Sequence, residues 1–183
     1  VQAWFLGVEA GPAIADVLTG TVNPSARLSM SFPQTVGQIP VYYNHMNTGR
    51  PLEGPYHRFV SGYLDCPNEP LYPFGYGLSY SDYRYSGFTV RTVKNAEDGT
   101  LAEVSVDVEN VSDVPGRETV QLYIRDVAAS VVRPVKELKD FVQIDLGAHE
   151  KKTVVFKVTR EMLSFWNNEA VVFEHGDFDL MAG

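Results

Sequence analysis

Alternation of apolar and polar residues with a period of two dominates the second half of the chain. Five segments show it: 104–108, 120–124, 142–146, 154–158 and 178–180. Because successive side chains of a strand point to opposite faces, this alternation predicts strands with one buried face. Turn-forming sequences such as EDGT, LGAHEK and EHGD separate the segments. Short strands at this spacing over about 100 residues favour an immunoglobulin-like β-sandwich.

A different pattern occupies the first 33 residues. Residues 1–6, VQAWFL, are continuously apolar and predict a buried strand. One apolar stripe of a short helix follows, formed by Ile14, Val17 and Leu18, and Gly20 is placed to end that helix. Residues 27–32, RLSMSF, alternate again and predict a second strand. Strand, helix and strand in this order predict part of an α/β sheet.

Glu9 is the one carboxylate of this N-terminal part whose position looks constrained, between the expected strand and the start of the helix. We expect its side chain to accept hydrogen bonds from the free N–H groups of the first helical turn. A direct role in chemistry is the alternative for this residue.

From Pro33 to about Leu78 no period is visible, but aromatic residues and prolines are frequent. Disordered segments are poor in aromatics, so we expect an ordered segment lying across a surface. Two stretches of it, HMNTGRP at 45–51 and YHRFVSGYLD at 56–65, combine amide, imidazole and guanidinium groups with tyrosines, which suits a polyhydroxylated ligand. The candidate contacts are His45, Asn47, Arg50, Arg58 and Tyr63. The alternative is that these groups only fasten the segment to its support.

The charge balance makes some partners unfavourable. Among 183 residues, 15 Lys and Arg face 23 Asp and Glu, which gives a net charge of −8 at pH 7. This sign repels phosphate, so we expect no nucleic-acid partner. No apolar run approaches the ~20 residues that span a bilayer, and no leader-like segment is present, so we expect no membrane partner. The strand-like opening VQAWFLG suggests a piece of a longer chain.

Metal and cofactor chemistry also has little support in the sequence. The single cysteine, Cys66, excludes an internal disulfide and a cysteine-based cluster. The four histidines show no metal-ligand spacing. We therefore expect neither a metal site nor a cofactor. Asn110–Ser112 form an N-glycosylation acceptor sequence, a motif that often arises by chance.

Residues 91–98 and 109–116 are expected to be polar tips between strands, with solvated charges.

Several long motifs resemble the C-terminal part of family 3 of the glycoside hydrolases, most closely its bacterial periplasmic β-glucosidase branch. GVEAGPAIADVLTGTVNPSARLSMSFP at 7–33 is similar to the stretch that closes the α/β sandwich domain of the family. GQIPVYYNHMNTGRP and LYPFGYGLSYSDY match two further signatures, and GRETVQLYIRD and RPVKELKDF resemble strands of its fibronectin type III-like domain. The resemblance implies a mixed fold: residues 1–80 finish an α/β sandwich domain, and residues 81–183 form a fibronectin type III-like β-sandwich.

The resemblance also implies a function. The family cleaves terminal β-D-glucosidic bonds with retention, and its nucleophile and acid/base residues are expected upstream of residue 1. We therefore assign no catalytic residue here and expect the chain alone to be structural and inactive. Its implied partners are the upstream catalytic domains and their carbohydrate substrate, in the periplasm or outside the cell. A sheet edge left open by missing upstream strands would favour self-association.

The rival hypothesis is a non-catalytic β-sandwich module that binds glycan or protein through the aromatic segment.

Overall fold

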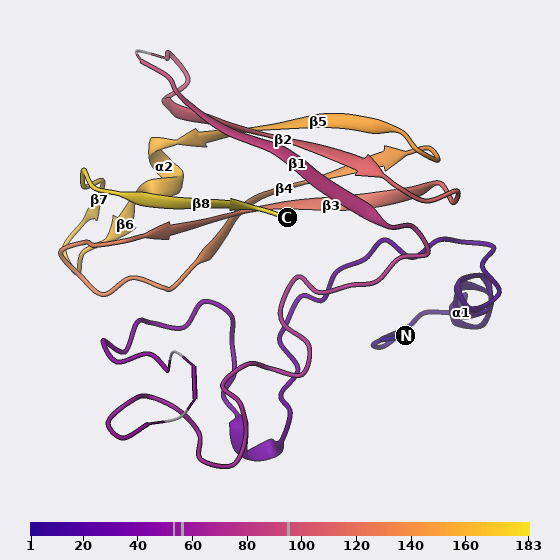
Figure 1. Cartoon of the computed structure of the whole chain (residues 1–183), viewed down its shortest axis with the longest axis horizontal. Coiled ribbons are helices and arrows are strands. Elements are labelled where there is room, and N and C mark those ends of the chain that lie inside the picture. The colour runs from indigo at the N-terminus through magenta and orange to yellow at the C-terminus, as the bar shows by residue number, and fades with distance from the viewer. Residues whose placement is uncertain (53, 56, 95) are drawn as a thin grey trace.

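The computed structural model describes residues 1–52, 54–55, 57–94 and 96–183. Within the described residues, all the strands lie between Tyr83 and Ala182 (Figure 1). They are β1 (Tyr83–Thr92), β2 (Thr100–Asn110), β3 (Gly116–Asp126), β4 (Glu137–Leu146), β5 (Lys151–Thr159), β6 (Phe165–Trp166), β7 (Val171–Val172) and β8 (Phe178–Ala182). The helices are α1 (Ala10–Leu18), a 3-10 turn at Val36–Gln38 and α2 (Arg160–Leu163).

Two antiparallel sheets form the layers of a β-sandwich. One has the strand order β1-β2-β5 and the other β4-β3-β8, while β6 and β7 form a separate short hairpin. The five segments predicted from alternation lie in β2, β3, β4, β5 and β8, so these strand predictions are confirmed. The mixed fold is confirmed in its β-sandwich part by this topology.

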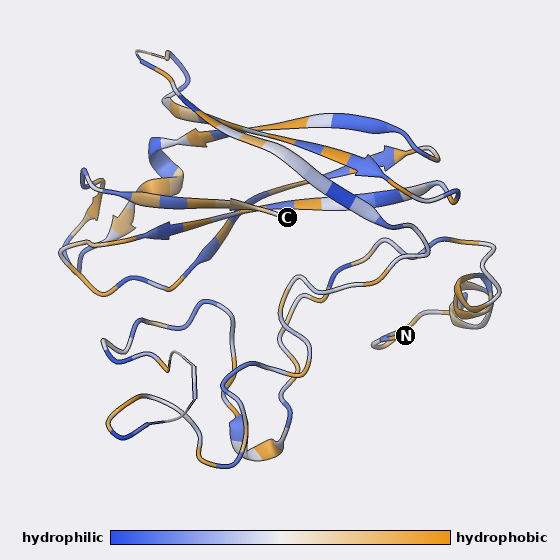
Figure 2. Cartoon of the chain, in the orientation of Figure 1, coloured by the Kyte–Doolittle hydropathy of each residue, from blue (hydrophilic) through white to orange (hydrophobic). Residues whose placement is uncertain are grey.

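The core lies between the two sheets and consists mainly of valines. The inward face of β2 is formed by Val104, Val106 and Val108, all almost completely buried. Val104 pairs with Phe156 and Val106 with Val154 of β5, so apolar side chains gather on one side of the sheet. Figure 2 shows the resulting alternation of hydrophobic and hydrophilic positions along the strands. Burial of these β-branched side chains stabilises the sandwich.

One expected polar tip, residues 109–116, turns out to begin inside a strand. Asn110 ends β2 and is completely buried, and its amide nitrogen donates to the carbonyl oxygens of Val114 (2.8 Å) and Gly147 (3.0 Å). The residue is an internal brace for two turns, so the nitrogen of the glycosylation acceptor sequence is not free. In the other expected tip, 91–98, the first two residues, Arg91 and Thr92, belong to β1.

The buried strand predicted at residues 1–6 is wrong. These residues are irregular, and Val1 and Phe5 are exposed. The helix is present as α1, and Gly20 follows it with φ 79°, the left-handed conformation expected at that end. The stripe of α1 is not a core face, since none of its residues is buried. The apolar side chains of residues 1–6 and of α1 are therefore not matched by burial within the described chain.

The strand predicted at 27–32 is also wrong as a sheet strand. The segment runs beside residues 71–77 and is joined to them by main-chain hydrogen bonds, such as Leu28 N to Tyr76 O and Phe32 N to Tyr72 O, both 2.8 Å. Only the Phe32–Tyr72 pair forms a β-bridge. Within residues 1–52, 54–55 and 57–80 there is no sheet, so the sheet edge invoked for self-association is absent from this part. Self-association itself stays a prediction.

The region between these two segments is a set of ordered loops below the sandwich in Figure 1. Gln38 is completely buried within it: its side-chain oxygen accepts from Gln34 N (2.7 Å) and its nitrogen donates to Pro67 O and Glu69 O (3.0 Å each). A single amide therefore ties two distant loop segments together. Across the described residues, no helix has the length and apolarity that crossing a membrane requires.

Candidate functional site

The five candidate residues lie on the loops that follow the 3-10 turn, and all five are exposed. His45 is the first, and its main-chain oxygen accepts a hydrogen bond from Val135 N of the sandwich (2.9 Å). Its ring nitrogen Nδ1 lies 3.2 Å from Met46 O. The Oδ1 of Asn47 accepts from Gly49 N (2.9 Å), which closes a tight turn. Both side chains therefore have a local structural contact.

The remaining three candidates lie where the loop folds back on itself. Ser61 N donates to Arg50 O (2.9 Å), and Pro51 and Ser61 form a parallel β-bridge. The hydroxyl of Tyr63 donates to the main-chain oxygen of Gln38 (2.9 Å), so this tyrosine fastens the loop. The guanidinium of Arg58 lies 6.0 Å from the ring centre of Phe59.

The candidate side chains thus differ in whether the described part of the loop holds them. Among the described residues, the guanidinium groups of Arg50 and Arg58 have no hydrogen-bond partner. Asn47 and Tyr63, by contrast, make hydrogen bonds within the loop. Tyr56, which belongs to the same aromatic stretch, lies outside the described residues.

Asn47 and Gly49 border a groove of about 360 Å³ whose other wall is the sandwich loop at 125–135. Arg133 of that wall is largely buried, bonds Glu137 through Nη2 (2.8 Å) and lies 4.5 Å from the ring centre of Phe165. Arg133 also lies 3.9 Å from the Asp126 carboxylate of the same wall, so acidic partners offset its charge. The opposite wall belongs to the described part of residues 43–63, which we call the candidate loop.

Three aromatic rings connect the candidate loop to the sandwich; we call Tyr43, Phe74 and Tyr123 the aromatic clamp. The rings of Tyr43 and Phe74 are stacked with centroids 4.2 Å apart, and Tyr123 of β3 meets Tyr43 edge-on at 5.8 Å. The main-chain N–H of Leu138 in β4 donates to the hydroxyl of Tyr43 (3.1 Å). Burial, and to a lesser degree Tyr43, raises the pKa of Tyr123 to about 12, so it stays protonated at neutral pH.

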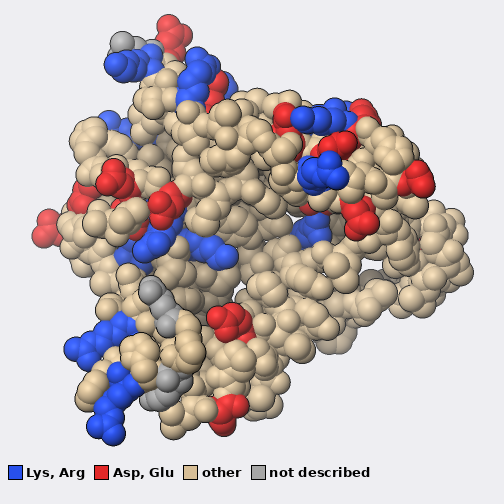
Figure 3. Space-filling view, viewed as in Figure 1, with Lys and Arg blue, Asp and Glu red and all other residues tan. Residues whose placement is uncertain are grey.

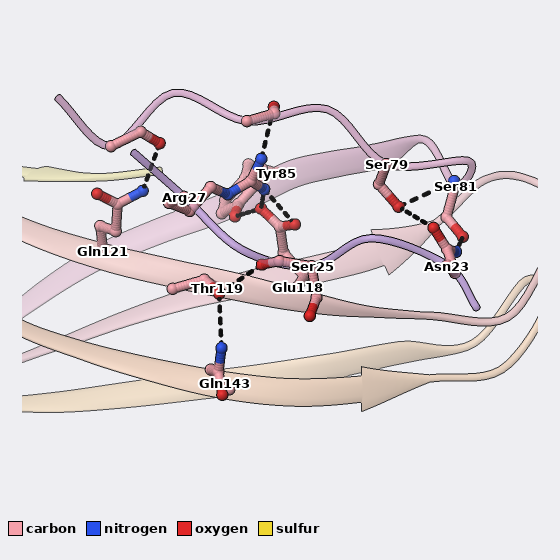
Figure 4. Close-up of polar contacts among 12 residues, drawn as sticks. Asn23, Ser25, Arg27, Ser79, Ser81, Tyr85, Glu118, Thr119, Gln121 and Gln143 are labelled. Atoms are coloured by element: carbon pink, nitrogen blue, oxygen red, sulfur yellow. Dashed lines mark hydrogen bonds and ion pairs between the residues drawn. The ribbon is translucent and has the colours of Figure 1, made fainter. Parts of the chain in front are cut away.

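A second contact between the N-terminal region and the sandwich is polar and buried (Figure 4). The carboxylate of Glu118 in β3 accepts two hydrogen bonds from Arg27 (2.5 and 2.6 Å) and one from the hydroxyl of Tyr85 in β1 (2.7 Å). Arg27 also donates to Gly77 O (2.6 Å). Burial, followed by the hydrogen bond to Glu118, raises the pKa of Tyr85.

Asn23 organises the adjoining turn. Its amide nitrogen donates to Ser81 Oγ (2.8 Å) and Pro115 O (3.0 Å), and its oxygen accepts from Ser79 Oγ and Tyr80 N (2.9 Å each). Sequence reasoning missed this role because an Asn-Pro pair reads only as a turn.

The sequence did contain an indication that Glu118 is buried. It stands two residues before Val120 in the alternation of β3, which is an inward position for a charged residue.

Glu9 does not do what the sequence predicted. It is the N-cap of α1, but its side chain makes no capping hydrogen bond and is exposed; only its main-chain oxygen is engaged, by Ala13 N at 3.0 Å. Cys66 is a free, partly buried thiol. In the described ranges no group of three or more His, Cys, Asp or Glu side chains could hold a metal ion.

Comparison with protein families assigns both halves of the chain. Residues 1–80 match the glycosyl hydrolase family 3 C-terminal domain, and residues 118–183 match the fibronectin type III-like domain. The chain carries the C-terminal region of glycosyl hydrolase family 3. Arg27 therefore lies in the family 3 match and its partner Glu118 in the fibronectin-like match, so this ion pair joins the two.

Relatives in family 3 match the chain along its whole length. It is 47% identical to a periplasmic beta-glucosidase of Salmonella typhimurium and 39% identical to a putative beta-xylosidase of Formosa agariphila, in each case over 100% of this chain but only 24% and 23% of the relative. The crystal structure of a beta-glucosidase from Listeria innocua in complex with glucose superposes with a TM-score of 0.91 at 50% identity, covering 98% of this chain and 25% of that one. The chain thus spans about a quarter of the family 3 proteins that it matches.

Proposed function

We propose that this chain is the C-terminal, supporting part of a retaining glycosidase that hydrolyses terminal β-D-glucosidic bonds. The observation that carries the proposal is the match over the full chain, at 47% identity, to a protein named as a periplasmic beta-glucosidase. A retaining mechanism needs two carboxylates about 5–5.5 Å apart, one as nucleophile and one as acid/base. We assign both to the upstream domains, so the chain alone is inactive.

The role of the chain in that enzyme is to support the catalytic domains and to border the substrate site. We propose His45, Asn47, Arg50, Arg58 and Tyr63 as contacts at its rim. The guanidinium groups of Arg50 and Arg58, which are exposed and have no hydrogen-bond partner among the described residues, support this, because guanidinium groups donate several hydrogen bonds to hydroxyl oxygens. The two domains of the chain are then residues 1–80 and 81–183.

Its partners are the upstream domains of the same protein and, through them, the carbohydrate substrate. Exposed apolar side chains in the N-terminal region, including Phe5, Val8 and Leu18, are available to pack against those domains. We place the enzyme in the periplasm or outside the cell, a proposal supported by the name of the relative from Salmonella typhimurium.

Hydrolysis of an aryl β-D-glucoside tests the proposal, with an aryl β-D-xyloside in parallel. The 183-residue chain is assayed beside the longer protein that contains it, and beside that protein with Arg50→Ala or Arg58→Ala. We expect glucoside hydrolysis by the longer protein only, with a raised KM in the two variants. Hydrolysis by the chain alone would overturn the proposal, and Glu9→Gln would then be the first variant to make. Glycan binding without hydrolysis by the longer protein would support the binding-module hypothesis instead.

A further inference from the structure

Residues 43–46 fasten the candidate loop to the sandwich, on both sides of the first rim candidate. Tyr43 packs between Phe74 and Tyr123, and its hydroxyl accepts from Leu138 N. Two residues later, Val135 N donates to His45 O (2.9 Å), and Met46 forms a β-bridge with Pro134. The sandwich therefore fixes the main chain at the entry to the segment that carries all five candidates.

Hydrogen bonds also link the aromatic clamp to a neighbouring residue of β3 and to the main chain at Gly75. The hydroxyl of Tyr123 donates to Oε1 of Gln121 (2.7 Å), and Nε2 of Gln121 donates to Gly75 O (3.2 Å). A Cβ at Gly75 would approach the Tyr123 hydroxyl to 2.7 Å, so the main chain beside Phe74 lies directly against β3. Tyr123 faces this surface because it alternates along β3 with Leu122 and Ile124, whose side chains are buried in the core.

We propose that Tyr43 is a positioning residue through which the β-sandwich sets the place of the rim and thereby the affinity of the enzyme for its carbohydrate substrate. This inference rests on the proposed function. Tyr43 touches no substrate; it fixes the loop through its neighbours. The physical reason is that the five candidate side chains are exposed, so the contacts at residues 43–46 are what hold the first part of the loop against the sandwich.

Hydrogen exchange on the 183-residue chain tests the mechanical part without any activity. The variants are Tyr43→Leu, which removes the ring contacts and the acceptor, and Tyr123→Leu, which removes the ring contact from the sandwich side. Tyr42→Leu is the matched control, because Tyr42 is the exposed neighbour. We expect amides at 45–52 and 57–63 to exchange about ten-fold faster in both clamp variants, given the usual strengths of an aromatic pair and a hydrogen bond. The control leaves these rates unchanged.

Folding of the variants is checked by protection of β2 and β5, which belong to the sheet that does not contain Tyr123. Tyr43→Phe keeps both ring contacts and loses only the acceptor for Leu138 N, so it gives a smaller acceleration and remains folded if Tyr43→Leu does not. Unchanged exchange at 45–52 and 57–63 in folded Tyr43→Leu and Tyr123→Leu overturns the proposal.

Kinetics of the longer protein test the functional part. With an oligosaccharide substrate, we expect KM to rise on the order of five-fold in Tyr43→Leu and Tyr123→Leu, with kcat nearly unchanged, because the change acts on binding through a coupled element. An unchanged KM beside accelerated exchange overturns the link to substrate affinity. Absence of any glycoside hydrolysis in the unmodified longer protein refutes the proposed function instead, and the exchange result is independent of it.

Discussion

The N-terminal region and the sandwich are stabilised by opposite means. All the buried hydrophobic side chains of the described chain lie between Val104 and Phe165. In the described part of residues 1–80, the only buried residues are polar, Ser31 and Gln38. Hydrophobic burial contributes more to stability than a typical hydrogen bond does, so the sandwich has a core of its own and the N-terminal region depends on its attachment.

The surface reflects the same difference. Ion pairs surround the sandwich, and acidic and basic side chains are interspersed over it in Figure 3. One part of the N-terminal region, at the right of that view, shows little charge, whereas its loops at the lower left carry basic and acidic side chains. A charged, paired surface is typical of a face in contact with water, whereas an uncharged surface with exposed apolar groups suits contact with protein.

The largest expected difference between the two regions is the loss of stability when one leucine in each is truncated to alanine. Leu122→Ala removes a completely buried side chain of β3 and should lower the free energy of unfolding by about 4 kcal/mol. Leu18→Ala at the exposed end of α1 should change it by less than about 0.5 kcal/mol. Chemical denaturation followed by tryptophan fluorescence measures both. Equal losses would mean that α1 is part of one cooperative core.

The buried ion pair is the next test, because it joins the regions. Arg27→Leu leaves the Glu118 carboxylate buried with only the Tyr85 hydroxyl as partner, so we expect a loss of about 3 kcal/mol. Exposed Arg117, paired with Asp145, is the matched control, and Arg117→Leu should have little effect. Hydrogen exchange should show the loss first at residues 23–28 and 71–81. A loss spread evenly over β2 and β5 would contradict the attachment argument.

The sandwich was predictable from sequence because its signal is local and self-contained. Alternation along β2 and β5 reports burial against a partner that the same chain provides. The apolar run at 1–6 gave the same kind of signal, but Val1 and Phe5 have no such partner in the described chain and the expected strand is absent. An apolar run in the sequence therefore indicates that its side chains favour burial, but it does not identify the segment against which they pack.

The sequence predicted which side chains the candidate loop presents, but not which residues hold the loop in place. Its Asn, His, Arg and Tyr side chains stand close together in sequence, so their shared surface could be inferred. The pairs that fix the loop and its supports are distant: Tyr43 and Leu138 are 95 residues apart, and Arg27 and Glu118 are 91 apart. Neither residue of such a pair lies in a local sequence pattern from which its partner could be identified.

A smaller effect tests how closely two segments of the N-terminal region, around residues 26–27 and 77, pack against each other. A Cβ at Gly77 would lie 2.6 Å from Ala26 O and 2.9 Å from Arg27 Cδ, so Gly77→Ala must displace main chain. We expect a loss of about 1–2 kcal/mol, as for overpacking elsewhere. Gly7→Ala is the control, since nothing lies within 4 Å of its added Cβ. Thermal unfolding of the two variants gives the difference; equal melting temperatures would show that the contact yields without cost.

The smallest effect should come from acid, and it should fall on the sandwich alone. The hydrogen bond from Arg117 lowers the pKa of Asp145 below its usual 3.8, and Lys151 does the same for Asp107. A lowered pKa in the folded state adds stability above about pH 3.8, and this is lost as the pH falls through the lowered value. Asp145→Asn should therefore weaken the dependence of the unfolding midpoint on pH below 4, as followed by far-ultraviolet circular dichroism. Asp65→Asn, in a loop of the N-terminal region and without an ion pair among the described residues, should leave the dependence unchanged. An equal response in both variants would mean that acid acts on the whole chain and not through the paired surface of the sandwich.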